Sequence, residues 1–114
     1  MNKLNIQHYT NEDHDRVTQM TEMIDKQTVI AKSTHIKHKK CQHIGFVKLK
    51  RGREYDHEFY VDHKGDIDLK IDELNRIPWI EQQMKEELGK LIREMGNEQE
   101  EKKLHPTLFR TKIN

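Results

Sequence analysis

The clearest pattern in the chain is an alternation of apolar and polar residues that recurs in three runs. In the run 45–50, Val47 and Leu49 alternate with polar or outward positions. The runs 54–62 and 66–72 also carry an apolar side chain or a histidine at every second position. An alternation with period two is typical of strands that bury one face. The three runs therefore predict an antiparallel meander.

The spacing between the first two runs predicts how these strands pair. A three-residue loop at 51–53 places Leu49 opposite Tyr55 on the buried face and Lys48 opposite Asp56 on the other face. A shift of one residue would move every side chain to the opposite face. We therefore predict this register, in which cross-strand acids neutralise the outward lysines.

Two helices are predicted on either side of the meander. The first, at 12–27, starts with acidic residues suited to a helix N-terminus, and Val17, Met20 and Ile24 form one helical stripe. The second, at 77–95, has apolar residues at spacings of three and four. Its stripe consists of Ile80, Met84, Leu88, Leu91 and Met95. This helix is expected to cover the apolar face of the sheet.

The predicted fold is α+β, with the order helix, three strands, helix (α-β-β-β-α). The stretch 28–37 is rich in β-branched residues and is a candidate fourth strand. Gly96 suits a helix C-terminus, and 97–103 contains no apolar residue. We therefore predict one small domain over 1–96, followed by a polar linker and tail over 97–114.

Composition limits the size of the core. Of the 114 residues, 32% are hydrophobic and 36% are charged, against about 45–50% and about 25% in typical globular proteins. A core this small predicts that a second copy of the chain or another protein completes the buried surface. The absence of a long apolar run argues against a membrane span or a signal segment. The single cysteine, Cys41, suits a reducing compartment, so we expect a cytoplasmic protein.

The net charge of +1 conceals a strong segregation of charge. Residues 32–53 contain eight basic residues and no acidic one, whereas 54–101 contain fifteen acidic and six basic residues. Phosphates are bound by several cations on one surface, and an outward aromatic ring can stack on a base. The segment 32–53 is therefore predicted to bind nucleic acid. The candidate contact residues are Lys37, Lys39, Lys40, Arg51, Arg53 and Phe46.

A cluster of His35, His38, Cys41 and His43 is a candidate metal site, because imidazole and thiolate are the ligands that zinc prefers. Four ligands within nine residues would crowd one loop, and the lysines between them would repel a cation. We therefore expect no cofactor, and zinc is the alternative.

A metal-dependent nuclease is a further alternative. On the predicted third strand, Asp68 and Lys70 share a face, with Glu58 and Tyr60 on the neighbouring strand. A metal held by these acids, together with the lysine, could activate water against a phosphate. The same residues also fit an ordinary solvent-facing sheet. We therefore expect a binding protein rather than an enzyme.

The sequence predicts a small nucleic-acid-binding accessory or regulatory protein. The main alternative is a protein-binding inhibitor or adaptor that acts through the acidic sheet face, through Trp79, or through Leu108 and Phe109 of the tail. Tryptophan is frequent at the energetic centres of protein interfaces. The chain has one alanine, fifteen lysines, six arginines and eleven isoleucines, which suggests an AT-rich genome such as that of a phage or mobile element.

Overall fold

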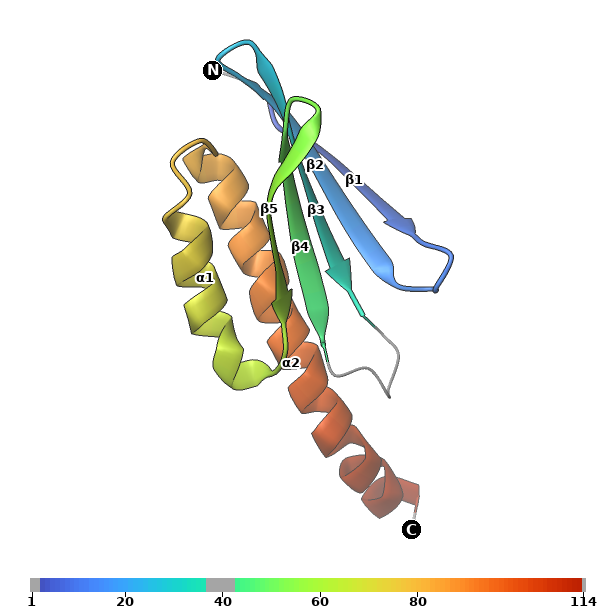
Figure 1. Ribbon diagram of the computed structural model, residues 1–114. Helices are drawn as coiled ribbons and strands as arrows, with labels where there is room; N and C mark the ends of the chain where they lie inside the picture. The colour runs from blue at the N-terminus through green and yellow to red at the C-terminus, as the bar shows by residue number, and fades with distance from the viewer. Residues whose placement is uncertain (1–2, 37–42, 114) are drawn as a thin grey trace.

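The chain forms five antiparallel strands followed by two helices (Figure 1). The computed structural model describes residues 3–36 and 43–113, and of 54–56, 64 and 98–113 it describes only the backbone. The strands are paired in the order of the chain: β1 (Asn5–Thr10), β2 (Arg16–Ile24), β3 (Gln27–His35), β4 (Gly45–Arg51) and β5 (Glu54–Val61). A 3-10 turn, η1 (Lys64–Asp66), leads into α1 (Ile67–Asn75) and α2 (Gln82–Ile113). The fold is therefore α+β, with the helices after the strands.

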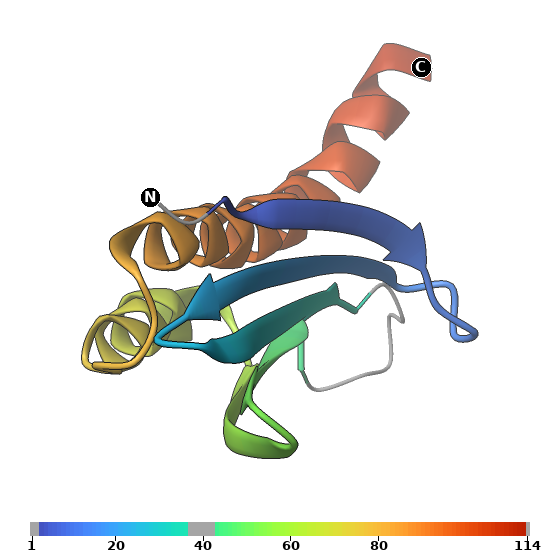
Figure 2. The same cartoon turned by 90° about the horizontal axis from the view of Figure 1, so that it is seen from above.

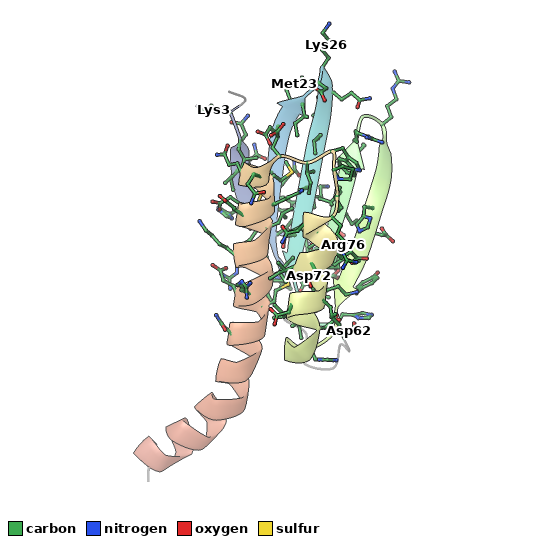
Figure 3. All side chains as sticks on the ribbon, turned by 90° about the vertical axis from the view of Figure 1, so that its left-hand side faces the viewer. Lys3, Met23, Lys26, Asp62, Asp72 and Arg76 are labelled. Atoms are coloured by element: carbon green, nitrogen blue, oxygen red, sulfur yellow. The ribbon has the colours of Figure 1, made fainter. Side chains whose placement is uncertain are left out.

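Both helices lie on the same side of the sheet (Figures 2 and 3). We call this side the helix face; its centre is the cross-strand row Met20, Ala31 and Leu49, all buried. Further strand residues, including Val29, Val47 and Phe59, belong to the same core, and the helices and their connection cover it with buried apolar side chains. These are Ile67, Leu74, Met84, Leu88, Ile92 and Met95, together with Ile77 and Ile80 of the connection. The opposite side, the outer face, carries no helix within the described residues.

The predicted helix at 12–27 is wrong, because these residues form a loop, β2 and the start of β3. Met20 and Ile24 are four residues apart, a spacing that fits a strand as well as a helix. Asn11, suited to a helix cap, instead accepts hydrogen bonds from the backbone N–H groups of Asp13 and Asp15 in the loop after β1, each at 2.9 Å. Cap and turn chemistry use the same short polar side chains.

The β2–β3 connection explains why the strand escaped detection. Ile24 pairs with Gln27, so the hairpin loop is Asp25-Lys26, and both residues have positive φ angles of 49° and 66°. This is the backbone of a type I′ turn, a turn type whose sequence usually contains a glycine. Lys26 stands here at the tip of the hairpin instead (Figure 3).

The predicted strand at 66–72 is also wrong, because α1 begins at Ile67. Ile67 and Leu74 are buried and Ile71 is half-buried, which is the i, i+4, i+7 spacing of a helical stripe. Leu69 is 66% exposed, although the alternation placed it in the core. The apparent period of two was therefore accidental.

The strands β3, β4 and β5 confirm the candidate strand at 28–37 and the first two runs, but the register of β4 and β5 differs. Leu49 pairs with His57 and Lys48 with Glu58, two residues beyond the predicted partners. The loop has two residues, and Gly52 takes the positive φ of 72° that a type II′ turn needs at its first position. Asp56 is the extra residue of a β-bulge, which restores the apolar alignment.

The final helix begins later and ends later than predicted. Pro78 lies in the connection before Gln82, because Ile77 and Ile80 fill the core from this loop. The predicted end at Gly96 is wrong: α2 continues to Ile113 and extends beyond the sheet (Figure 1). This extension gives the molecule dimensions of 59 × 28 × 25 Å. The domain boundary after residue 96 stays a prediction.

Candidate nucleic-acid interface

Two aromatic rings lie side by side on the outer face. Phe46 of β4 is paired with Tyr60 of β5, and both lie on the face opposite Val47 and Phe59, which are buried in the core. The two ring centroids are 5.6 Å apart, with an angle of 50° between the planes. Tyr60 is 46% exposed. The β4–β5 pairing therefore presents an aromatic surface to solvent.

His43 extends this surface at the end of β4. Its ring stacks on Tyr60 with a centroid separation of 4.2 Å and an interplanar angle of 28°. Nδ1 of His43 hydrogen-bonds to Oδ1 of Asp62, the residue after β5. This bond orients the imidazole and leaves Nε2 for another partner. We call His43, Tyr60 and Phe46 the aromatic row.

Lysines lie next to the aromatic row. Nζ of Lys48 is 5.6 Å from the centroid of the Phe46 ring, within the range of a cation–π contact. Lys48 is paired with Lys32 of β3 on one side and with Glu58 of β5 on the other. Like charges in directly opposite positions are unfavourable in a sheet. Glu58 offsets part of this positive charge on the β5 side, and the two lysines remain neighbours on the outer face.

The structure places the predicted nucleic-acid contacts in different environments. Phe46 is on the outer face, as predicted. Arg51 belongs to the helix face, where its guanidinium lies 5.0 Å from the centroid of the Trp79 ring. Arg53 is exposed in the β4–β5 turn, at the opposite end of β4 from Phe46. The remaining three candidates, Lys37, Lys39 and Lys40, lie outside the described residues.

The candidate metal ligands are only partly described. His38 and Cys41 lie outside the described residues. His35 lines a cavity against α2 on the helix face, whereas His43 stacks on Tyr60 of the outer face. In the parts of the chain that the structure describes, no three histidine, cysteine or acidic side chains are arranged to hold a metal ion. The zinc alternative stays a prediction.

The residues of the nuclease alternative do not lie on a sheet. Asp68 and Lys70 belong to α1, where two residues of separation place side chains on different sides of the helix. Asp68 lies 3.7 Å from the Arg93 guanidinium, and Lys70 lies 3.9 Å from Glu73. The predicted grouping of Asp68 and Lys70 with Tyr60 on one sheet face is therefore wrong.

The candidate partner-binding residues also separate. Trp79 is half-buried against the core, beneath Arg51, and is not an isolated exposed anchor. Leu108 and Phe109 lie in the extension of α2, where only the backbone is described. The acids at 66–72 lie on η1 and α1, as Asp72 shows in Figure 3, so the predicted acidic sheet face loses them.

Sequence reasoning identified Phe46 but missed the rest of the aromatic row. Tyr60 was an outward residue of an alternating run, and this position was the available signal. Its pairing with Phe46 depends on the β-bulge at Asp56, and no pattern of residues in the sequence predicts this bulge. His43 was grouped with other potential metal ligands, because its contact with Asp62 joins residues nineteen positions apart.

Comparison with protein-family models, with curated proteins and with solved structures found no match to this chain. Among the described residues, no helix combines the length and apolar character needed to cross a bilayer.

Proposed function

We propose that this protein binds single-stranded nucleic acid, as an accessory or regulatory protein without catalytic activity. The observation that carries the proposal is the aromatic row on the sheet face over which no described helix packs, with the ammonium group of Lys48 beside Phe46. Exposed aromatic rings stack on unpaired bases, and lysines bind the phosphates between them. Stacking requires bases that are free of a partner strand, which favours single strands over a duplex.

The basic segment 32–53 supports the same surface. The connection from β3 to β4 begins at Ile36 and ends at Ile44, which are joined by a backbone hydrogen bond of 3.0 Å. His43 of the aromatic row belongs to this connection, and the lysines at 37, 39 and 40 lie outside the described residues. Among the described residues, Lys32 and Lys48 are paired on the outer face beside the row, so a strand stacked on the row would pass these two cations. The proposal does not include Arg51, whose guanidinium lies against the Trp79 ring on the helix face.

Fluorescence anisotropy with labelled single-stranded RNA and DNA tests this proposal. We expect Phe46→Ala to weaken binding by about tenfold or more, since base stacking on one ring is worth about 1–3 kcal/mol. Lys48→Gln should weaken binding and reduce its dependence on salt by about one counterion. Leu69→Ala and Lys90→Gln are the matched controls, because Leu69 and Lys90 are exposed on the helices.

Two results would refute the proposal. One is wild-type protein that binds neither RNA nor DNA at low salt, where phosphate contacts are strongest. The other is binding that Phe46→Ala and Lys48→Gln weaken no more than the two control substitutions do. Stronger binding to duplex than to single strands would remove the stacking argument.

A second copy of the chain is the protein partner that we propose. Strand β1 is an edge of the sheet, and all six of its side chains are exposed, including Ile6 and Tyr9. An edge strand offers backbone N–H and C=O groups to another strand. β1 contains no charged residue, whereas the opposite edge, β5, contains Glu54, Asp56 and Glu58, which would repel their own copies. Antiparallel pairing of two β1 strands would give a two-fold dimer with a continuous sheet.

We also propose that the protein is cytoplasmic and that it comes from a phage or a mobile element.

A further inference from the structure

One end of the helix face is polar, although the rest of that face forms the apolar core. His8 of β1, Thr18 of β2 and Ser33 of β3 are cross-strand neighbours in a single row. The next row pairs Arg16 with His35. Burial of polar side chains beside a core is costly unless partners satisfy them. Of these five residues, Thr18 and Ser33 are buried, His35 is half-buried, and His8 and Arg16 are exposed. Two buried hydroxyl groups beside three further polar side chains therefore indicate a site rather than a packing defect.

These five side chains and α2 line a partly open cavity of about 80 Å³. The helix contributes Glu94 and two apolar residues to its lining. Thr18 and Ser33 are only 4% and 3% exposed, so their hydroxyl groups lie deep between the sheet and the helix. The volume exceeds the roughly 10–15 Å³ that one water molecule requires. The cavity can therefore hold a small polyatomic ligand.

We propose that this cavity binds a small oxyanion of the phosphate class. The lining offers the Arg16 guanidinium, two imidazoles and two hydroxyl groups, all of which can donate hydrogen bonds. Nδ1 of His8 and Oγ1 of Thr18 are 3.0 Å apart, which fixes the His8 ring. A neutral His8 and Thr18 then supply one donor to the ligand between them: Nε2 of His8 when Thr18 donates to Nδ1, or the Thr18 hydroxyl when Nδ1 donates to it. Arginine has five N–H donors in a planar fork that matches the oxygens of phosphate. A single protein partner does not use all five donors.

Glu94 makes phosphate a better ligand than sulfate. Its carboxylate is the acidic group of the cavity lining and repels the oxygens of a fully ionised anion. Hydrogen phosphate and dihydrogen phosphate carry O–H groups, and a carboxylate accepts a hydrogen bond from an O–H group. Sulfate has no proton to donate at neutral pH, so it would leave Glu94 facing an acceptor. The site should therefore discriminate between two anions of similar size.

A metal ion is a poorer occupant of this cavity. His8, His35 and Glu94 have the side chains of metal ligands, but they are not arranged as a set of three that could hold a metal. The Arg16 guanidinium also carries a permanent positive charge into the lining. The cavity lies on the helix face, so this proposal stands independently of the outer face and of nucleic-acid binding.

Isothermal titration of the full chain with sodium phosphate, with sodium sulfate as comparison, tests the proposal. We expect saturable binding of phosphate, and weaker binding of sulfate by about tenfold, because one hydrogen bond is replaced by repulsion. Arg16→Gln should weaken phosphate binding by about tenfold or more. Arg76→Gln is the matched control, because Arg76 is exposed at the end of α1 and outside the cavity lining.

Two further variants keep the test decisive if Arg16→Gln does not fold. Ser33→Ala removes one buried hydroxyl and should weaken phosphate binding, while Glu94→Gln should abolish the preference for phosphate over sulfate. Heat signals that do not saturate, or binding that all of these substitutions leave unchanged, would overturn the proposal. A cavity that contains only water in phosphate-soaked crystals would overturn it as well.

Discussion

Met95 of α2 lies directly over Gly45 of β4, so closely that a Cβ atom at position 45 would overlap with the Met95 sulfur. The carbonyl oxygen of Thr34 on β3 is 2.7 Å from the same Cβ position. Gly45 therefore lets α2 approach the sheet next to Phe46 of the aromatic row. The contact sets the height of α2 above the cavity, since Met95 also belongs to the cavity lining.

Gly45→Ala should destabilise the protein by about 1–3 kcal/mol, the range typical of overpacked sites. The added methyl group would meet both a flexible side chain and a backbone oxygen, and the backbone oxygen cannot easily move. Met95→Ala in the same chain should therefore recover part of the loss but not all of it. Urea denaturation of the two single variants and the double variant measures this coupling, and strictly additive changes would contradict the contact.

Leu69 and Leu74 should respond very differently to truncation. Leu74→Ala should cost about 2–5 kcal/mol, because Leu74 is fully buried. Leu69→Ala should change stability by less than about 0.5 kcal/mol, because Leu69 faces solvent on α1. Thermal and urea denaturation compare the two variants. A large loss for Leu69→Ala would favour the strand over the helix at 67–75.

Glu22 introduces a buried carboxyl group into the helix face. Glu22 is 4% exposed, and its Oε2 has no hydrogen-bond partner. Burial raises the pKa of the Glu22 carboxyl, and the nearby Glu81 carboxylate raises it further. An acid whose pKa is higher in the folded state binds protons more readily when folded. The ionised form therefore destabilises the protein above that pKa, and the penalty disappears as the pH falls through it.

Glu22→Gln should therefore stabilise the protein at pH 7, because glutamine carries no charge that burial and Glu81 would disfavour. The gain should shrink as the pH is lowered from 7 through the raised pKa of Glu22, because the native carboxyl group then becomes protonated. Urea denaturation of both proteins across this range gives the difference. Glu86→Gln, an exposed substitution on α2, serves as the control. A gain that does not depend on pH would refute this account.

Glu58 should weaken the proposed binding of nucleic acid. It is exposed on β5 directly opposite Lys48, where it offsets the charge of the lysine and repels phosphate. Glu58→Gln should tighten binding to single strands by about two- to fivefold at low salt, with less effect at high salt. Glu86→Gln changes the net charge equally but on α2, so it isolates the effect of position. Equal tightening by both variants would indicate a general charge effect.

The proposed dimer predicts a mass that depends on β1. Light scattering coupled to size-exclusion chromatography should show a two-fold assembly at high concentration. Gln7→Lys places a charge in the middle of β1, next to its own copy in the dimer, and should shift the equilibrium to monomer. Lys90→Gln, an exposed substitution on α2 and not on β1, should leave the mass unchanged. A monomeric wild-type protein at every concentration would exclude the dimer.

The local pattern of the sequence determined the strands β3, β4 and β5 and the outward position of Phe46, but not the loop length or the register of the β4–β5 hairpin. These strands follow from alternation and β-branched content, which act over a few neighbouring residues. The apolar stripe of α2 was equally legible, and Met84, Leu88 and Met95 are buried as its spacing requires. Each of these elements has one period that fits and no competing one.

Only the tertiary structure decided between the two periods at β2 and α1. Residues four apart share a face in a strand and in a helix, so Met20 and Ile24 do not distinguish them. The residue midway between two such positions distinguishes a strand from a helix, and its burial depends on what packs against it. Glu22, midway between Met20 and Ile24, is buried, whereas Leu69, midway between Ile67 and Ile71, is exposed. Burial is set by contacts between residues that are distant in sequence. Such contacts also decided the bulge at Asp56 and the pairing of Tyr60 with Phe46.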